Sequence, residues 1–198
     1  MEGFERWYRR SAHVFATVSI SYYFISDAGI MGFAKRLLIV SILLTLVLLD
    51  LYRMKRAISP SGFREYETSR FGSYIYFGIG TCILLLLFPQ QIAIPCIVSS
   101  ALVDPVIGEV RRKYFLLAYL LGFGIGFLIF YSVWLTSEIS IQVSLISASL
   151  LVLSELKKNR YLDDDLLTQI VPAIFLIIIY FLMGPSILPR EIIPDILG

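Results

Sequence analysis

Residues 115–135 read FLLAYLLGFGIGFLIFYSVWL and contain no charged side chain. A transmembrane helix needs about 20 consecutive, mainly apolar residues, because it must cross a hydrocarbon layer roughly 30 Å thick. This segment meets that requirement. The rest of the chain is similar, since 58% of its 198 residues are hydrophobic and only 16% are charged. So short a chain cannot bury that much apolar surface in its own core, which excludes a soluble globular domain, a disordered chain and a nucleic-acid-binding domain.

Seven apolar runs predict an all-α integral membrane protein that forms one helical domain over residues 1–198. The predicted spans are 13–33, 37–52, 71–88, 91–103, 115–135, 139–154 and 166–183. The fourth span is short, contains Pro95 and is expected to end at Asp104. A helix too short to cross the bilayer usually ends in a protein-lined cavity, since its last carbonyl groups need partners. The end of this helix is therefore a candidate position for a site.

The lysines and arginines predict an orientation. With seven spans, 14 of the 17 lie on one side of the membrane, and the other three are Lys35, Arg36 and Arg190. The positive-inside rule places the richer side in the cytoplasm. We therefore expect a cytoplasmic N-terminus and a C-terminal tail along the outer interface. The expected location is the plasma membrane in a prokaryote and the endoplasmic reticulum in a eukaryote.

Carboxylates gather on the same side as the arginines. The acidic residues next to the predicted spans on that side include Asp104, Glu109, Glu155, Asp163, Asp164 and Asp165. Carboxylate oxygens suit Mg²⁺, which often shares them with substrate phosphates. Arginines bind phosphate oxygens in a forked geometry. This mixture predicts a site for phosphate and a divalent metal on the cytoplasmic face.

The segment VDPVIGEVRRK, residues 103–113, is the most informative part of that face. If it is helical from Pro105, which a first helical position accepts, then Asp104, Gly108 and Arg111 with Arg112 lie near one helix face. A helix that begins with Asp104 as its N-cap and carries an interfacial positive anchor explains the same residues. The sequence leaves both interpretations open.

Two further groups have alternative explanations. Asp163, Asp164 and Asp165 repel one another unless a cation is near, so they indicate either a metal or arginine site or a solvated acidic turn that caps the seventh span. His13 follows Arg10 at the start of the first span. It is a candidate to accept the proton of an alcohol, and equally a helix-end residue bonded to a lipid headgroup.

Taken in order, these segments resemble the dolichol kinase family of CTP-dependent lipid kinases. That family includes phytol kinases and yeast-type diacylglycerol kinase, and it is related to integral-membrane phosphatidate cytidylyltransferases. The resemblance is carried by RRSAH at 9–13, REYE at 64–67, DPVIGEVRR at 104–112, and Glu155 followed by DDDL at 163–166. Val103 and Asp165 stand where the family has glycine and asparagine, and the proline expected near Gln169 is displaced to Pro172.

The resemblance implies Mg²⁺-dependent transfer of the γ-phosphoryl group of CTP to the hydroxyl of a membrane lipid alcohol. The implied metal ligands are Asp104, Glu109, Glu155, Asp163 and Asp164. The implied nucleotide-binding residues are Arg10, Arg64, Glu67, Gly108, Arg111, Arg112 and Asp165. The implied catalytic residues are Asp104, Arg111, Arg112 and His13.

Other functions stay open. A cytidylyltransferase would make a CDP-lipid from a lipid phosphate and release pyrophosphate. A transporter or a structural membrane protein is the alternative outside enzymes. A transporter usually carries ionisable residues near the bilayer midplane, whereas the predicted spans are almost free of charge. Nucleic acid is not expected as a partner, and the sequence leaves open both the lipid and whether the chain forms a homo-oligomer.

Overall fold

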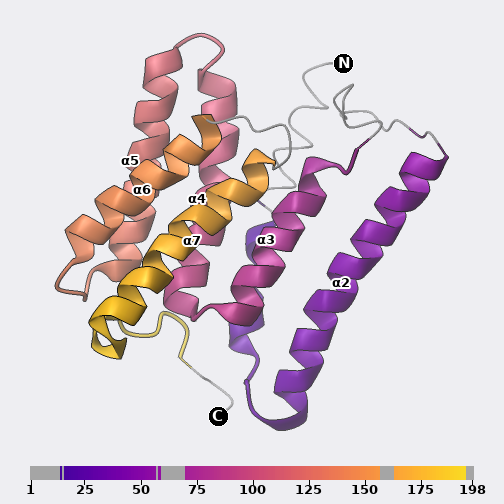
Figure 1. The fold of residues 1–198 in the computed structure, drawn as a ribbon, viewed down its shortest axis with the longest axis horizontal. Coiled ribbons are helices and arrows are strands. Elements are labelled where there is room, and N and C mark those ends of the chain that lie inside the picture. Colours follow the sequence, from indigo (N-terminus) through magenta and orange to yellow (C-terminus); the bar gives the residue numbers. More distant parts are fainter. Residues whose placement is uncertain (1–13, 15, 57, 59–69, 157–162, 195–198) are drawn as a thin grey trace.

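The computed structural model describes residues 14, 16–56, 58, 70–156 and 163–194, and these residues form helices and no strand. The elements are the 3-10 helix η1 (Thr17–Phe24), the α-helices α2 (Gly29–Lys55), α3 (Ser73–Leu87), α4 (Gln90–Val110), α5 (Phe115–Trp134), α6 (Ser140–Leu156) and α7 (Asp164–Met183), and the short η3 (Pro185–Ile187). The α-helices alternate in direction (Figure 1). Helices α2, α4 and α6 end, and α3, α5 and α7 begin, at the upper end of the bundle in Figure 1. The opposite end is called the lower end.

The helical fold class is confirmed, but the number of predicted spans is not. Among the described residues, four helices are long and apolar enough to cross a membrane, namely α2, α4, α5 and α7. Helices α3 and α6 are also apolar, but have only 15 and 17 residues. At 1.5 Å per residue they reach about 22 and 26 Å, which is less than the hydrocarbon thickness.

The prediction of a continuous first span at 13–33 is wrong. The chain forms η1, leaves helical geometry at Ile25, and enters α2 only at Gly29. Gly29 has φ of 54°, a conformation that L side chains rarely adopt. A Cβ on Gly32 would lie 2.0 Å from the backbone oxygen of Asp27. This tight turn moves Lys35, which the sequence placed in a loop, into the second turn of α2.

The prediction that the fourth span ends at Asp104 is also wrong, because α4 continues through Pro105 to Val110. A proline inside a helix removes one backbone donor and crowds the preceding turn. Val103 and Ile107, on either side of Pro105, are fully buried in the core. We infer that their packing outweighs the local preference for a break, so Asp104 is a helical residue and not an N-cap.

Helix α5 packs closely on its neighbours through two glycines. A Cβ on Gly122 would lie 2.6 Å from Cδ1 of Ile107 in α4, and one on Gly126 would lie 2.9 Å from Cδ2 of Leu151 in α6. Small residues allow helices to approach closely where apolar packing must hold them together. Gly122 and Gly126 therefore let α5 lie close to α4 and α6.

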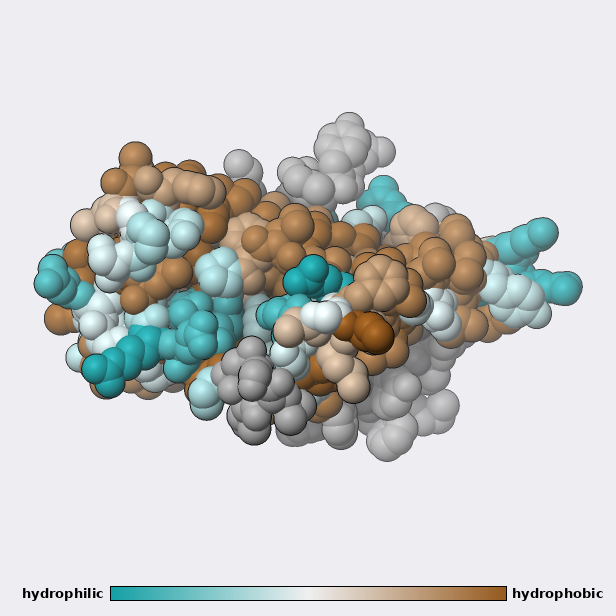
Figure 2. Space-filling model, turned by 90° about the horizontal axis from the view of Figure 1, so that it is seen from below, coloured by the Kyte–Doolittle hydropathy of each residue, from teal (hydrophilic) through white to brown (hydrophobic). Residues whose placement is uncertain are grey.

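The segment after α7 is hydrogen-bonded across the lower end. The Gln90 side chain donates to the carbonyl of Ile193 and accepts from its N–H, both at 2.9 Å. Gln91 Nε2 donates to the carbonyl of Pro189 at 3.3 Å. Seen from below, hydrophobic residues cover much of the molecule and hydrophilic residues gather in restricted patches (Figure 2).

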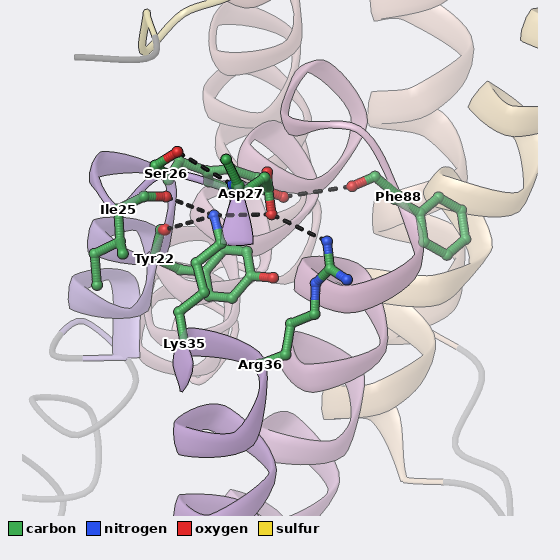
Figure 3. A network of polar contacts seen from close by, with 9 residues as sticks. Tyr22, Ile25, Ser26, Asp27, Lys35, Arg36 and Phe88 are labelled. Atoms are coloured by element: carbon green, nitrogen blue, oxygen red, sulfur yellow. Dashed lines mark hydrogen bonds and ion pairs between the residues drawn. The ribbon is translucent and has the colours of Figure 1, made fainter. Parts of the chain in front are cut away.

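A buried lysine holds η1 against α2 at the lower end (Figure 3). Lys35 Nζ donates to the carbonyl of Ile25 at 2.6 Å and lies 3.0 Å from Asp27 Oδ1. The same ammonium lies 4.3 Å from the centroid of the Tyr22 ring. These four residues, Tyr22, Ile25, Asp27 and Lys35, are called the Lys35 cluster. Its lysine satisfies a carbonyl group that the end of η1 leaves without a helical partner.

We expect Gly32→Ala to lower the free energy of unfolding by about 2 kcal/mol or more, because the new Cβ would force the turn at Asp27 to move. Thermal unfolding in detergent measures this. The matched control is Gly124→Ala, because nothing lies within 4 Å of a Cβ there. The control should be neutral or stabilising by up to about 1 kcal/mol. Equal melting temperatures for the two variants would contradict the close approach.

Candidate functional site

The upper end joins α4 and α6 through an ion pair. Arg111, which follows directly after α4, donates from Nη1 to Oε1 of Glu155 in α6 at 3.0 Å. The Glu155 side chain is 2% exposed and that of Arg111 is 24% exposed. Burial of the guanidinium opposes its charge, but a side-chain hydrogen bond with Tyr119 and the Glu155 carboxylate outweigh it and raise the pKa of Arg111. The guanidinium is therefore a permanent positive charge at the edge of the site.

Asp104 lies on the face of α4 that leads from this ion pair towards α7. It is two helical turns before Arg111 and one turn after Ser100. Ser100 Oγ lies 2.7 Å from Thr168 Oγ1, and Thr168 is in the first two turns of α7. The Asp104 charge also contributes to the raised pKa of Arg111. Helical spacing thus places Asp104 between the Arg111–Glu155 pair and the start of α7.

The three consecutive aspartates form the start of α7. Asp163 is the N-cap, and its Oδ1 accepts from the backbone N–H of Asp165 at 3.1 Å. The capping explanation is therefore confirmed for Asp163. One carboxylate oxygen from each of Asp163, Asp164 and Asp165 lies within 4.8 Å of the others. Asp165 is buried, whereas the other two are half-buried. This is an oxygen-rich group of like charges, which is the donor set that a hard divalent cation prefers.

The remaining predicted site residues lie either at the upper end of α4 or outside the described residues. Gly108 is a half-buried residue of α4, while Glu109 and Arg112 are exposed at the upper end. The predicted nucleotide-binding residues Arg10, Arg64 and Glu67, and the predicted base His13, lie outside the described residues. The structure therefore joins Arg111 to Glu155 and groups the three aspartates of α7 with one another. A single site that combines these residues with Asp104 and with the four undescribed residues stays a prediction.

Sequence reasoning missed a buried charged cluster where α2 meets α3. The Asp50 carboxylate is fully buried and accepts from Arg53 Nε at 2.5 Å, Gly72 N–H at 3.0 Å and Tyr74 Oη at 2.6 Å. These residues, Asp50, Arg53, Gly72 and Tyr74, are called the Asp50 cluster. The available signal was a carboxylate at the end of an apolar run with an arginine three residues later, which is a helical pair spacing.

A second missed feature is a hydrogen-bonded contact inside the bundle. Gln169 of α7 accepts from Thr81 Oγ1 at 3.3 Å and donates to the carbonyl of Phe77 at 3.2 Å, so it joins α7 to α3. Its side chain is fully buried. Gln169 is one of the positions where the chain departs from the motif discussed above. In this structure the amide is a helix-packing residue one turn below the aspartates.

Comparisons of the chain with protein-family models, with curated proteins and with solved structures gave no significant match. Function is therefore inferred from the chemistry of the upper end together with the motif resemblance.

We expect Glu155→Gln and Arg111→Gln each to lower the free energy of unfolding by about 1–3 kcal/mol, because each leaves a partly desolvated charge without its partner. The double variant should lose less than the sum of the two. Thermal or denaturant unfolding of the four proteins in detergent gives the coupling energy. Additive losses would show that the two side chains do not interact in the folded protein.

Proposed function

We propose that this protein is a membrane-embedded phosphotransferase that uses CTP and Mg²⁺ to phosphorylate the hydroxyl group of a membrane lipid alcohol. The observation that carries the proposal is that Asp104, the Arg111–Glu155 ion pair and the aspartates 163–165 all lie in the parts of α4, α6 and α7 nearest the upper end. Carboxylates and a permanently charged guanidinium at a helix-bundle end are what a metal–triphosphate substrate requires. The choice of CTP as donor comes from the motif resemblance alone.

The donor set of the upper end fits Mg²⁺. The clustered oxygens of Asp163, Asp164 and Asp165 are carboxylate oxygens within 4.8 Å of one another. Asp104 and Glu109 belong to the last two turns of α4, and the proposal keeps them as further ligands of the metal. A bound Mg²⁺ would neutralise charge on the triphosphate. Glu155 is assigned a different role from the implied one, because its Oε1 accepts from Arg111 at 3.0 Å. It positions the guanidinium and does not serve as a primary metal ligand.

The protein side chains then have distinct tasks in the transfer. Arg111, with Arg112 and Arg10, offsets negative charge on the phosphoryl group while it moves, which is the main form of catalysis in this reaction class. The alcohol oxygen forms the new bond to the γ-phosphorus, and the bond between that phosphorus and the β–γ bridging oxygen breaks. The alcohol proton passes to a carboxylate of the site or to His13, and CDP leaves.

The proposal includes a membrane orientation. Of the ten lysines and arginines in the described residues, seven lie at or next to the upper ends of α2, α3, α4 and α5, and by the positive-inside rule this end faces the cytoplasm. CTP is then available to the site directly from the cytoplasm. The lipid alcohol is supplied from the bilayer, with its hydroxyl at the interface. The orientation favours an interfacial enzyme over a transporter, whose charged groups would line a path across the membrane.

The test is to incubate purified protein with γ-labelled CTP, Mg²⁺ and a panel of polyprenols, phytol-like alcohols and diacylglycerol. We expect label in the lipid fraction, CDP as the product, and loss of transfer when the metal is chelated. A parallel reaction contains α-labelled CTP and a lipid phosphate. Label in the lipid there, with pyrophosphate released, would replace the kinase proposal with a cytidylyltransferase. No labelled lipid in either reaction would overturn both.

We expect Asp104→Asn to reduce phosphoryl transfer at least 100-fold, because it removes one charge from the site while it keeps the side-chain shape. The rate of lipid labelling measures this, and the melting temperature checks the fold. Glu138→Gln is the matched control, because Glu138 is an exposed carboxylate in the α5–α6 connection at the lower end. The control should keep the parent rate. Full activity of Asp104→Asn would remove Asp104 from the site.

A further inference from the structure

Helix α2 is attached to the bundle almost entirely at its two ends. Its fully buried residues are Gly32, Lys35, Asp50 and Arg53. Lys35 belongs to the Lys35 cluster at the lower end, and Asp50 and Arg53 belong to the Asp50 cluster at the upper end. Between Lys35 and Asp50, no residue of α2 is fully buried. Figure 1 shows the helix at one side of the bundle, next to α3.

The middle of α2 meets α3 along a thin apolar contact. The half-buried residues of this part of α2 are Ile39, Leu43, Leu46 and Val47, which share one helix face. Leu43 approaches Gly78 of α3, where a Cβ would lie 3.3 Å from Leu43 Cδ1. These four residues together with Gly78 are called the α2–α3 seam. The seam leads upward to Tyr74, one helical turn before Gly78, which donates to Asp50.

Four other helix contacts have polar or closely interlocked interactions that resist separation. Helix α4 is joined to α7 by the buried Ser100–Thr168 contact, and α3 is joined to α7 by the two hydrogen bonds of Gln169. Helix α5 interlocks with α4 and α6 at Gly122 and Gly126. The α2–α3 seam, between its two polar clusters, is held by apolar contacts of half-buried side chains.

We propose that the α2–α3 seam binds the hydrocarbon chain of the lipid alcohol and directs its hydroxyl to the upper end. This inference rests on the proposed function. Lipid chains are as apolar as leucine, so a chain can replace the contacts between α2 and α3 at little cost. Separation of a polar cluster within the bilayer would cost several kcal/mol for each group left without a partner. The clusters therefore keep α2 in place while the seam admits a chain.

The dimensions of the seam fit this role. Lys35 and Asp50 are 15 residues apart in α2, or about 22 Å at 1.5 Å per residue. One leaflet is half of a hydrocarbon layer roughly 30 Å thick, so it is shorter than the distance from Lys35 to Asp50. A chain along the seam therefore reaches from the middle of the membrane to the Asp50 cluster. That cluster lies at the same end of the bundle as Asp104 and the aspartates of α7.

Photolabelling tests the proposal without reference to activity. The purified full chain in phospholipid nanodiscs is exposed to a long-chain alcohol with a diazirine midway along the chain. We expect labelled peptides from 39–47 and from the start of α3, with at least five-fold less label when excess unlabelled alcohol is added. Labelling that is spread equally over the exposed faces of α5 and α2, and is insensitive to the competitor, would overturn the proposal.

A variant that fills the seam gives the second measurement. Gly78→Leu places a side chain against Leu43, and the matched control Gly124→Leu adds the same side chain where nothing lies within 4 Å. We expect Gly78→Leu to reduce the competed labelling at least five-fold and to raise KM for a long-chain alcohol. Its kcat/KM for a five-carbon alcohol should stay within two-fold of the parent value. The control should change neither quantity.

The two proposals fail in different ways. Parent protein that phosphorylates no alcohol but shows competed labelling at the seam would remove the kinase function and keep the chain-binding surface. Active Gly78→Leu protein with unchanged labelling and unchanged KM for the long-chain alcohol would remove the surface and keep the kinase function. An equal loss of activity with long and short alcohols would also count against the seam, because filling it would then act on the reaction and not on chain binding.

Discussion

A charge that is buried in apolar surroundings needs a partner, because removal of an isolated ion from water costs several kcal/mol even after the protein relaxes. Three ion pairs in the described part of the chain meet this requirement for Lys35, Asp50, Arg53 and Glu155. Lys35 pairs with Asp27 at 3.0 Å, Asp50 with Arg53 at 2.5 Å, and Glu155 with Arg111 at 3.0 Å. The clusters around these pairs connect η1 to α2, α2 to α3, and α4 to α6. The helix arrangement depends on them because apolar contacts alone do not distinguish a neighbouring helix from lipid.

The interior away from the helix ends is joined by neutral polar groups. Ser100 with Thr168, and Thr81 with Gln169, are buried contacts between helices that are far apart in the sequence. Neutral polar groups cost less to bury than ions when they are hydrogen-bonded. The chain therefore has its charged chemistry at the helix ends and its neutral hydrogen bonds in the middle. This distribution favours a helix end over the bundle interior as the place for the proposed reaction on a charged nucleotide.

The apolar runs predict most of the helices, but they do not predict where a helix is broken or continues past a proline. The run at 115–135 became α5 almost residue for residue, because nothing in it competes with a helix. Pro105 indicated a helix boundary, yet the burial of Val103 and Ile107 kept α4 continuous. The turn before Gly29 depends on a single close approach at Gly32, which an apolar pattern does not reveal. The charged residues of the candidate site could be named from the sequence because they lie in motifs. Asp50 was not recognised, because its partners Gly72 and Tyr74 come from the start of the next helix, 22 and 24 residues away.

The two ends of the bundle differ in electrostatic balance. At the lower end, Asp27 is matched by Lys35 and Arg36, and the segment after α7 is hydrogen-bonded to Gln90 and Gln91. At the upper end, three consecutive aspartates place carboxylate oxygens within 4.8 Å of one another, and one of them belongs to a buried side chain. Like charges at such short range repel one another, and any positive group or cation nearby lowers the free energy of their grouping. Among the described residues, the upper end therefore has the group of clustered carboxylate oxygens on which the proposed metal–triphosphate substrate depends.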